Sequence, residues 1–294
     1  MKIILKLFDV KTFTASLLPV LFGSAYSLYV YGRINWLLTL LLAVALMSIQ
    51  AATNMLNDYI DYRRGSDGAD QADEKALVSG AFTAKQVLAF TAALATAALA
   101  IGIYIAVRTS WVVLLVAAAG AAVAVLYSAA PKPISHTPFG EAASGITMGF
   151  GITSTVVYIQ SGQFTGQTLL MALPTAVYIA YIMFTNNLCD IEKDKSAGRF
   201  TLPARLGFEI AKPIWLLCCF VLILITVILI IAGVYPVWAL LALLMVLNYR
   251  ALNTFRLYSQ EQFQKGKMMA FIGKLGIQYH LLMVAGFLIA YGLK

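Results

Sequence analysis

The chain has 294 residues, of which 61% are hydrophobic and only 12% are charged. Soluble globular domains carry about 25% charged residues, so this composition excludes an ordinary soluble fold and predicts a protein of the lipid bilayer. The formal net charge is +8, and membrane topology accounts for it without a nucleic-acid partner.

Apolar runs of roughly 20 residues, long enough to cross a hydrocarbon core as helix, recur along the whole sequence. In chain order, we predict membrane spans at residues 13–31, 36–56, 87–107, 111–127, 139–159, 168–187, 213–233, 236–252 and 270–291. The first run is longer than a signal-peptide core and lacks a small-residue cleavage site, so we interpret it as a retained span. The predicted fold class is all-α, a multi-spanning transmembrane bundle of about nine helices in a single domain, 1–294.

The placement of charges predicts the orientation of the bundle, because Lys and Arg near the ends of spans stay on the cytoplasmic side. With the N-terminus inside, all of the 21 basic residues lie on that side except Arg33, Arg108 and Lys294. All 13 acidic residues lie there too, mostly in the loops after the second and sixth spans. We therefore expect a cell-membrane protein whose chemistry is confined to its cytoplasmic loops.

An internal repeat brings the same polar pattern to the ends of the second and sixth spans. Each copy has an Asn four residues before an Asp, followed by a second acidic residue and a Gly. The Asn–Asp pairs are Asn54 with Asp58 and Asn186 with Asp190. We interpret residues 1–134 and 135–265 as two four-helix repeats with a ninth helix appended.

The two acidic clusters are the main candidates for a functional site. If each span continues as helix, the Asn and the two Asp residues of each cluster project from one face. Crowded carboxylates repel each other, and a divalent cation relieves that repulsion. Mg²⁺ prefers oxygen ligands and is usually held by one or two carboxylates together with substrate phosphate oxygens. The predicted Mg²⁺ ligands are Asp58, Asp61, Asp67, Asp190 and Asp194; for Asp67 a solvated surface position is the open alternative.

Several motifs resemble one known family over nearly the whole chain. They are NDYIDYRRG from Asn57, LVSG from Leu77, YSAAPK from Tyr127, DIEKD from Asp190 and RFTLPARLG from Arg199. Together they are similar to the UbiA-type intramembrane prenyltransferase superfamily. The chain departs from the first signature at Gly65, where the family often has another Asp, and Asp67 is the candidate replacement.

Two further motifs narrow the resemblance. KTFTASLLPVLFG from Lys11 and PKPISHTPFGE from Pro131 are most similar to the 1,4-dihydroxy-2-naphthoate prenyltransferases of menaquinone synthesis, although Arg is common there where this chain has Lys11. The resemblance implies Mg²⁺-dependent transfer of a polyprenyl group from a polyprenyl diphosphate to an aromatic acceptor. With the naphthoate, CO₂ leaves and demethylmenaquinone forms.

Other acceptors of the superfamily stay open, namely 4-hydroxybenzoate, homogentisate, haem and glycerol-phosphate lipids. A secondary transporter is a weaker alternative, because carriers bind near the bilayer midplane and no acidic residue lies in the middle of a predicted span. A phosphatidyltransferase of the CDP-alcohol type is disfavoured, because its D-G-x-x-A-R signature is absent.

Ionising an allylic diphosphate places negative charge on the leaving group, which basic side chains stabilise. The candidates for this role are Lys132, Arg64, Arg199 and Lys75, with lipid-headgroup contact as the alternative. The substrate-binding candidates also include Asn54, Asn57, Asn186 and Asn187. The predicted catalytic residues are Asp58, Asp61, Asp190, Asp194 and Tyr127.

Tyr127 could steady the carbocation or orient the acceptor, although a Tyr at the end of a span is often an interfacial anchor. Glu141 opens the fifth span, where a lone carboxylate indicates a role or stabilises the helix N-terminus. The cysteines and histidines have no ligand-like spacing, and we interpret them as packing and ordinary polar residues: Cys189, Cys218, Cys219, His136 and His280.

Overall fold

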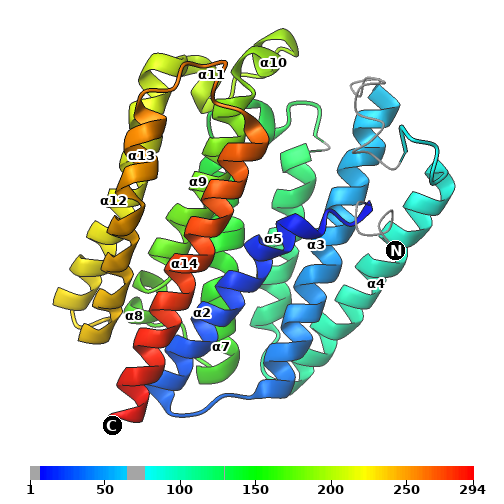
Figure 1. The fold of residues 1–294 in the computed structure, drawn as a ribbon. Helices are drawn as coiled ribbons and strands as arrows, with labels where there is room; N and C mark the ends of the chain where they lie inside the picture. The colour runs from blue at the N-terminus through cyan, green and yellow to red at the C-terminus, as the bar shows by residue number, and fades with distance from the viewer. Residues whose placement is uncertain (1–6, 65–76, 129) are drawn as a thin grey trace. The chain divides into compact units, whose positions relative to one another are not determined.

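The computed structural model describes residues 7–64, 77–128 and 130–294. These residues form helices and contain no strand, so the predicted all-α class is confirmed (Figure 1). The chain divides into two compact units, each described by itself. The first comprises Met1–Leu17 and Asn35–Ala124, and the second comprises Leu18–Ile34 and Val125–Lys294.

Each predicted span coincides with helix. The long segments are α2 (Thr14–Tyr31), α3 (Trp36–Arg64), α4 (Ala84–Arg108), α5 (Val112–Ser128), α6, η4 and α7 (Gly140–Ser144, Gly145–Gly151 and Ile152–Ser161), α8 and α9 (Gly166–Leu170 and Leu173–Cys189), α12 (Phe208–Ile231), η5 and α13 (Val237–Asn248 and Tyr249–Arg256), and α14 (Lys265–Gly292). Seven segments of the described chain are long and apolar enough to cross a bilayer, and α5 is a shorter apolar helix. The short helices are η1 (Val10–Phe13), η3 (Ile134–His136), α10 (Ile191–Ser196) and α11 (Leu202–Leu206).

In the first unit, α3 and α4 pack side by side along their length (Figure 1). Leu7, Met55, Leu77 and Val87 form a buried cluster near the end of this hairpin that carries the first acidic motif. Thr83 caps α4: its hydroxyl accepts from the backbone N–H of Gln86, whose side chain in turn accepts from the backbone N–H of Thr83. This reciprocal bonding starts α4 directly after the loop.

In the second unit, α9 packs against α6, η4, α12 and α14. The Trp215 indole on α12 is buried and donates to the Thr185 hydroxyl on α9 at 2.8 Å. Tyr178 of α9 donates to the Ile272 carbonyl of α14 at 3.4 Å. These buried contacts fix the final turns of α9, from which the second acidic motif projects.

The π-helix η4 approaches α9 closely because two of its residues are glycines. A Cβ on Gly149 would lie 2.4 Å from Ala176 Cα and 2.6 Å from the Thr175 carbonyl oxygen. Both are backbone atoms of α9, so a side chain here would force the two helices apart. Small residues permit such close helix contacts in membranes.

We expect Gly149→Ala to destabilise the protein by about 1–3 kcal/mol, the usual cost of overpacking. The measurement is the melting temperature in detergent, compared with Gly273→Ala. A Cβ on Gly273 of α14 meets nothing within 4 Å, and Ala favours helix over Gly, so the control should melt no earlier than the wild type. Equal melting of Gly149→Ala and the wild type would contradict the close packing of η4 on α9.

Candidate functional site

The first acidic motif lies on the last turns of α3, which continues as helix beyond the predicted span to Arg64. Asn54, Asn57 and Asp58 are half-buried there, and the Oδ1 atom of Asn57 is buried with no hydrogen-bond partner among the described residues. Asp61 and Arg64 belong to the end of the same helix, but their side chains lie outside what the structure describes. Asp67 and Lys75 lie outside the described residues.

Asn54 connects α3 to the N-terminal segment. Its Nδ2 atom donates to the Thr12 hydroxyl at 2.8 Å and to the Phe8 carbonyl at 3.1 Å. The amide therefore anchors the segment before α2 against the helix that carries the first motif. Its repeat counterpart, Asn186, makes a different contact.

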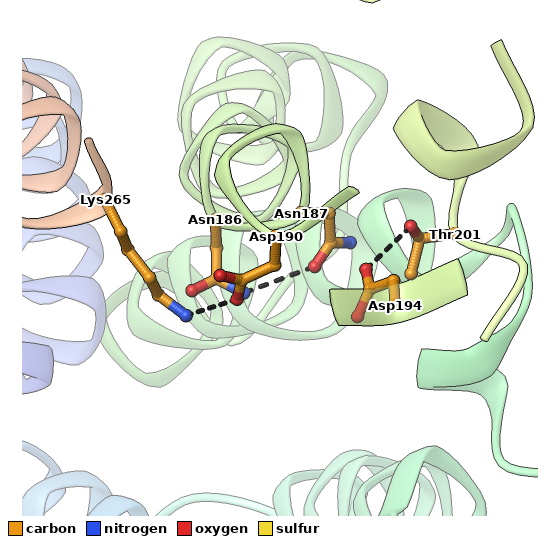
Figure 2. Close-up of polar contacts among 6 residues, drawn as sticks. All are labelled: Asn186, Asn187, Asp190, Asp194, Thr201 and Lys265. Carbon is orange, nitrogen blue, oxygen red and sulfur yellow. Dashed lines mark hydrogen bonds and ion pairs between the residues drawn. The ribbon is translucent and has the colours of Figure 1, made fainter. Parts of the chain in front are cut away.

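The second acidic motif lies where α9 ends, and Figure 2 shows its polar contacts. Lys265, the first residue of α14, donates to Asp190 Oδ2 at 2.5 Å. Asn186 Nδ2 donates to Asn187 Oδ1 at 3.2 Å. The Thr201 hydroxyl donates to Asp194 Oδ2 at 2.9 Å. The two carboxylates of the motif thus have different partners, a lysine for Asp190 and a buried threonine for Asp194.

The continuous helical face predicted for this motif is interrupted at Asp190. Helix α9 ends at Cys189, Asp190 has φ −107° and ψ 15°, and α10 begins at Ile191. Gly198, with φ +66°, then reverses the chain in a conformation that glycine adopts without strain. The reversal brings the Arg199 N–H to the Asp194 carbonyl at 2.8 Å and Thr201 to its side chain.

Asp194 is 5% exposed. Burial raises the pKa of its carboxyl group above the ordinary value, because the charged form is desolvated, while the Thr201 hydrogen bond and the positive charge of Arg199 oppose this shift. A buried carboxylate of this kind is stabilised by a cation. Asp190 already has a cationic partner in Lys265, so both groups suit positive charge.

The Asn187 amide links the motif to Glu141, at the start of α6. Asn187 Nδ2 donates to Glu141 Oε1 at 2.8 Å, and both residues are buried. The second oxygen of Glu141 has no hydrogen-bond partner within the described part of the chain. Tyr127 Oη lies 3.7 Å from the position that a Cβ on Gly140, the residue before Glu141, would occupy.

The basic residues predicted for the diphosphate differ in exposure. Lys132 is exposed and Arg199 is half-buried, as is Tyr127. The cysteines Cys189, Cys218 and Cys219 are free, as expected for packing residues. His280 is fully buried between aromatic rings, with Nδ1 2.8 Å from the Gly276 carbonyl oxygen.

Sequence reasoning missed two partners of the acidic motif. Thr201 follows a loop whose reversal depends on tertiary packing. Lys265 is 75 positions from Asp190. In the sequence it stands out only as one of the basic residues of a predicted cytoplasmic segment. No spacing rule connects either residue to the carboxylate that it contacts.

Within the described residues, no group of three or more acidic, His or Cys side chains is placed to hold a metal ion. Two carboxylates with substrate phosphate oxygens are nevertheless a usual environment for Mg²⁺. The oxygen donors of Asp190 and Asp194, and the cation that Asp190 already binds, fit this chemistry.

Comparisons with known proteins show which family and relatives the chain resembles. A family model described as the UbiA prenyltransferase family matches residues 16–275. The 1,4-dihydroxy-2-naphthoate octaprenyltransferase of Bacillus subtilis (strain 168) is 36% identical over 199 residues, covering 67% of this chain and 64% of that protein. The UbiA prenyltransferase domain-containing protein 1 of Danio rerio is 30% identical over 213 residues, covering 71% and 63%. The matched region therefore spans slightly less than two thirds of each relative.

The fold of the chain is similar to that of a solved structure. The UbiA homologue from Archaeoglobus fulgidus bound to GPP and Mg²⁺ superimposes with a TM-score of 0.69 at 14% identity, covering 98% of this chain and 99% of that one. At this identity the likeness shows a shared helical fold.

Proposed function

The chain belongs to the UbiA prenyltransferase family, and from this we propose that it transfers a prenyl group from an allylic diphosphate to an aromatic acceptor with the help of Mg²⁺. The observation that carries the proposal is the carboxylate pair of the second motif, in which Asp190 forms an ion pair with the ammonium of Lys265 and Asp194 is buried. The homologue that binds GPP and Mg²⁺ supports the same chemistry.

We propose that metal ligands come from both acidic motifs. Asp190 and Asp194 belong to the second motif, and Asp58, Asp61 and Asp67 are the candidates of the first. When bound, Mg²⁺ neutralises negative charge on the diphosphate and so favours its departure. The proposal for the first motif rests on the repeat in the sequence.

The side chains around the second motif would bind and orient the diphosphate. Arg199 is held beside Asp194 by its backbone hydrogen bond, and its guanidinium suits phosphate oxygens. Lys132 is exposed just before η3, and Arg64 and Lys75 would act from the first motif. Asn186 and Asn187 would donate or accept hydrogen bonds beside Asp190.

Tyr127 would act on the allylic carbocation rather than on the diphosphate. Its hydroxyl oxygen lies next to Gly140, at the start of the segment formed by α6, η4 and α7. An aromatic face stabilises a passing cation, and apolar helix surfaces around it would exclude water, which otherwise quenches a carbocation. The prenyl chain would lie among the membrane helices.

We propose 1,4-dihydroxy-2-naphthoate as the acceptor, since the Bacillus subtilis relative is named for that substrate and the motifs from Lys11 and Pro131 resemble the same group. The product would be demethylmenaquinone. Other acceptors are the alternative. We further propose a cell-membrane location with the acidic loops on the cytoplasmic side, from the distribution of basic residues.

The test is to incubate the purified protein with Mg²⁺, a long-chain allylic diphosphate and either dihydroxynaphthoate or 4-hydroxybenzoate. With the naphthoate, the expected product is lighter than the simple adduct by the mass of CO₂, as measured by mass spectrometry. Chelation of the metal should abolish it. A product formed only from 4-hydroxybenzoate would replace the proposed acceptor, and no product from any acceptor would contradict the proposed function.

A further inference from the structure

The contact between Lys265 and Asp190 joins the first residue of one long helix to the end of another. Lys265 opens α14, and Asp190 follows the last residue of α9. In Figure 2 the lysine side chain reaches toward the motif and ends at the Asp190 carboxylate. The ammonium therefore occupies the position of a cation on a proposed metal ligand.

This ion pair is poorly suited to hold the two helices together. The Lys265 side chain is 47% exposed and that of Asp190 is 20% exposed, and solvent screening makes pairs of this kind weak. Buried contacts already join α9 to α14, including the hydrogen bond from Tyr178 to the Ile272 carbonyl and the packing of the Tyr178 ring over Gly276. The helices do not need the ion pair to stay together.

The neighbouring Lys267 provides a contrast within the same turn. Its Nζ atom lies 4.6 Å from the centre of the Tyr258 ring and hydrogen bonds to the hydroxyl of that residue. Lys267 is thus committed to an aromatic partner on the loop before α14. Lys265 differs because its charge is directed at the acidic motif.

We propose that Lys265 is a diphosphate-binding residue that occupies Asp190 until Mg²⁺ displaces it. This inference rests on the proposed function and extends it to a residue outside the Asp-rich motifs. The ammonium and a metal ion would compete for the negative charge of Asp190, so metal binding would weaken the hold of the carboxylate on Lys265 and free the lysine side chain. The freed side chain is long and flexible, carries three N–H donors, and would lie beside the diphosphate leaving group as negative charge develops on it.

If Lys265 exchanges in this way, removing its charge should change the affinities for Mg²⁺ and for pyrophosphate in opposite directions. In Lys265→Met, Mg²⁺ alone should bind several-fold more tightly than to the wild type, because it no longer competes with an ammonium ion. Inorganic pyrophosphate in saturating Mg²⁺ should bind about tenfold more weakly, because one charge-assisted hydrogen bond is lost. Calorimetry on the full-length protein in detergent measures both affinities without turnover.

Two variants serve as controls. Lys267→Met removes the same charge from the same turn and should leave both affinities within about twofold of wild type. Lys265→Arg keeps the charge and should recover most of the pyrophosphate affinity. The melting temperature of Lys265→Met should equal that of the wild type, because the ion pair is exposed.

Each remaining outcome overturns the inference. If Lys265→Met leaves both affinities unchanged, or weakens both, Lys265 does not exchange between the carboxylate and the diphosphate. If every substitution of Lys265 lowers the melting temperature strongly, the pair is a structural brace. If the wild type binds neither Mg²⁺ nor pyrophosphate, the proposed function fails and this inference fails with it. If Asp190→Asn abolishes binding but the substitutions of Lys265 leave both affinities unchanged, only the inference fails.

Discussion

Replacing Asp190 by Asn is expected to reduce prenyl transfer by at least about a hundredfold, as for the loss of one group that stabilises a developing charge. The substitution keeps the size of the side chain and removes its charge. The neutral amide would be a weaker ligand for a hard divalent cation and would no longer attract the ammonium of Lys265. Turnover at saturating substrate measures the effect, and raising the Mg²⁺ concentration should restore activity only in part.

Folding and surface charge are controlled separately. The Asp190 side chain is 20% exposed and makes a solvent-screened ion pair, so Asp190→Asn should melt close to the wild type. Glu209→Gln removes an exposed carboxylate from the first turn of α12 and should retain full activity. Activity of Asp190→Asn within about tenfold of the wild type would show that this carboxylate is not a metal ligand.

Asp58→Asn extends the test to the first motif. Asp58 is half-buried on α3, in the repeat position that corresponds to Asp190. If both motifs supply metal ligands, the two substitutions should cause similar losses, and the double variant should be little worse than either, because groups that act as one unit are not additive. Independent, multiplying losses would instead indicate two separate roles.

The helices were predictable from sequence because their main determinant is local. An apolar run that crosses a bilayer must satisfy its own backbone hydrogen bonds, and a helix does so within the segment. The first motif continues as helix to Arg64, which is the condition under which the spacing places Asn54, Asp58 and Asp61 on one helical face. In the spans and at the end of α3, both the sequence pattern and the structure follow from the need to satisfy backbone hydrogen bonds within the segment.

The conformation and contacts of the second motif were not predictable from local sequence. The break at Asp190 depends on the reversal through Gly198 and on the packing of α11 against α9, which the spacing of Asn186, Asp190 and Asp194 does not encode. Lys265 and Glu141 are distant in sequence from the groups that they contact, and Thr201, seven residues after Asp194, reaches that carboxylate only because the chain reverses between them. Spacing singled out the candidate carboxylates, and only the tertiary structure shows which side chains contact them.

Glu141 is the partner whose removal should most affect activity without removing a predicted ligand. Its Oε1 atom accepts from Asn187 Nδ2 at 2.8 Å, and Asn187 Oδ1 in turn accepts from Asn186 Nδ2 at 3.2 Å. An amide has one accepting end and one donating end, so the carboxylate determines which end of Asn187 faces Asn186. Asn186 lies one helical turn before Asp190, and Glu141 therefore positions the polar side chains beside that proposed ligand.

We expect Glu141→Leu to lower kcat by about 10- to 100-fold, the usual cost of removing a partner one step away from a metal ligand. Leu cannot accept from Asn187 and leaves that buried amide free to turn, whereas Glu141→Gln keeps an accepting oxygen and should recover most of the rate. Ser154→Ala, which removes a buried hydroxyl of α7 that has no hydrogen-bond partner in the described chain, should leave kcat unchanged. Equal losses in the Leu and Gln variants would mean that the charge of Glu141, rather than its orientation of Asn187, supports the reaction.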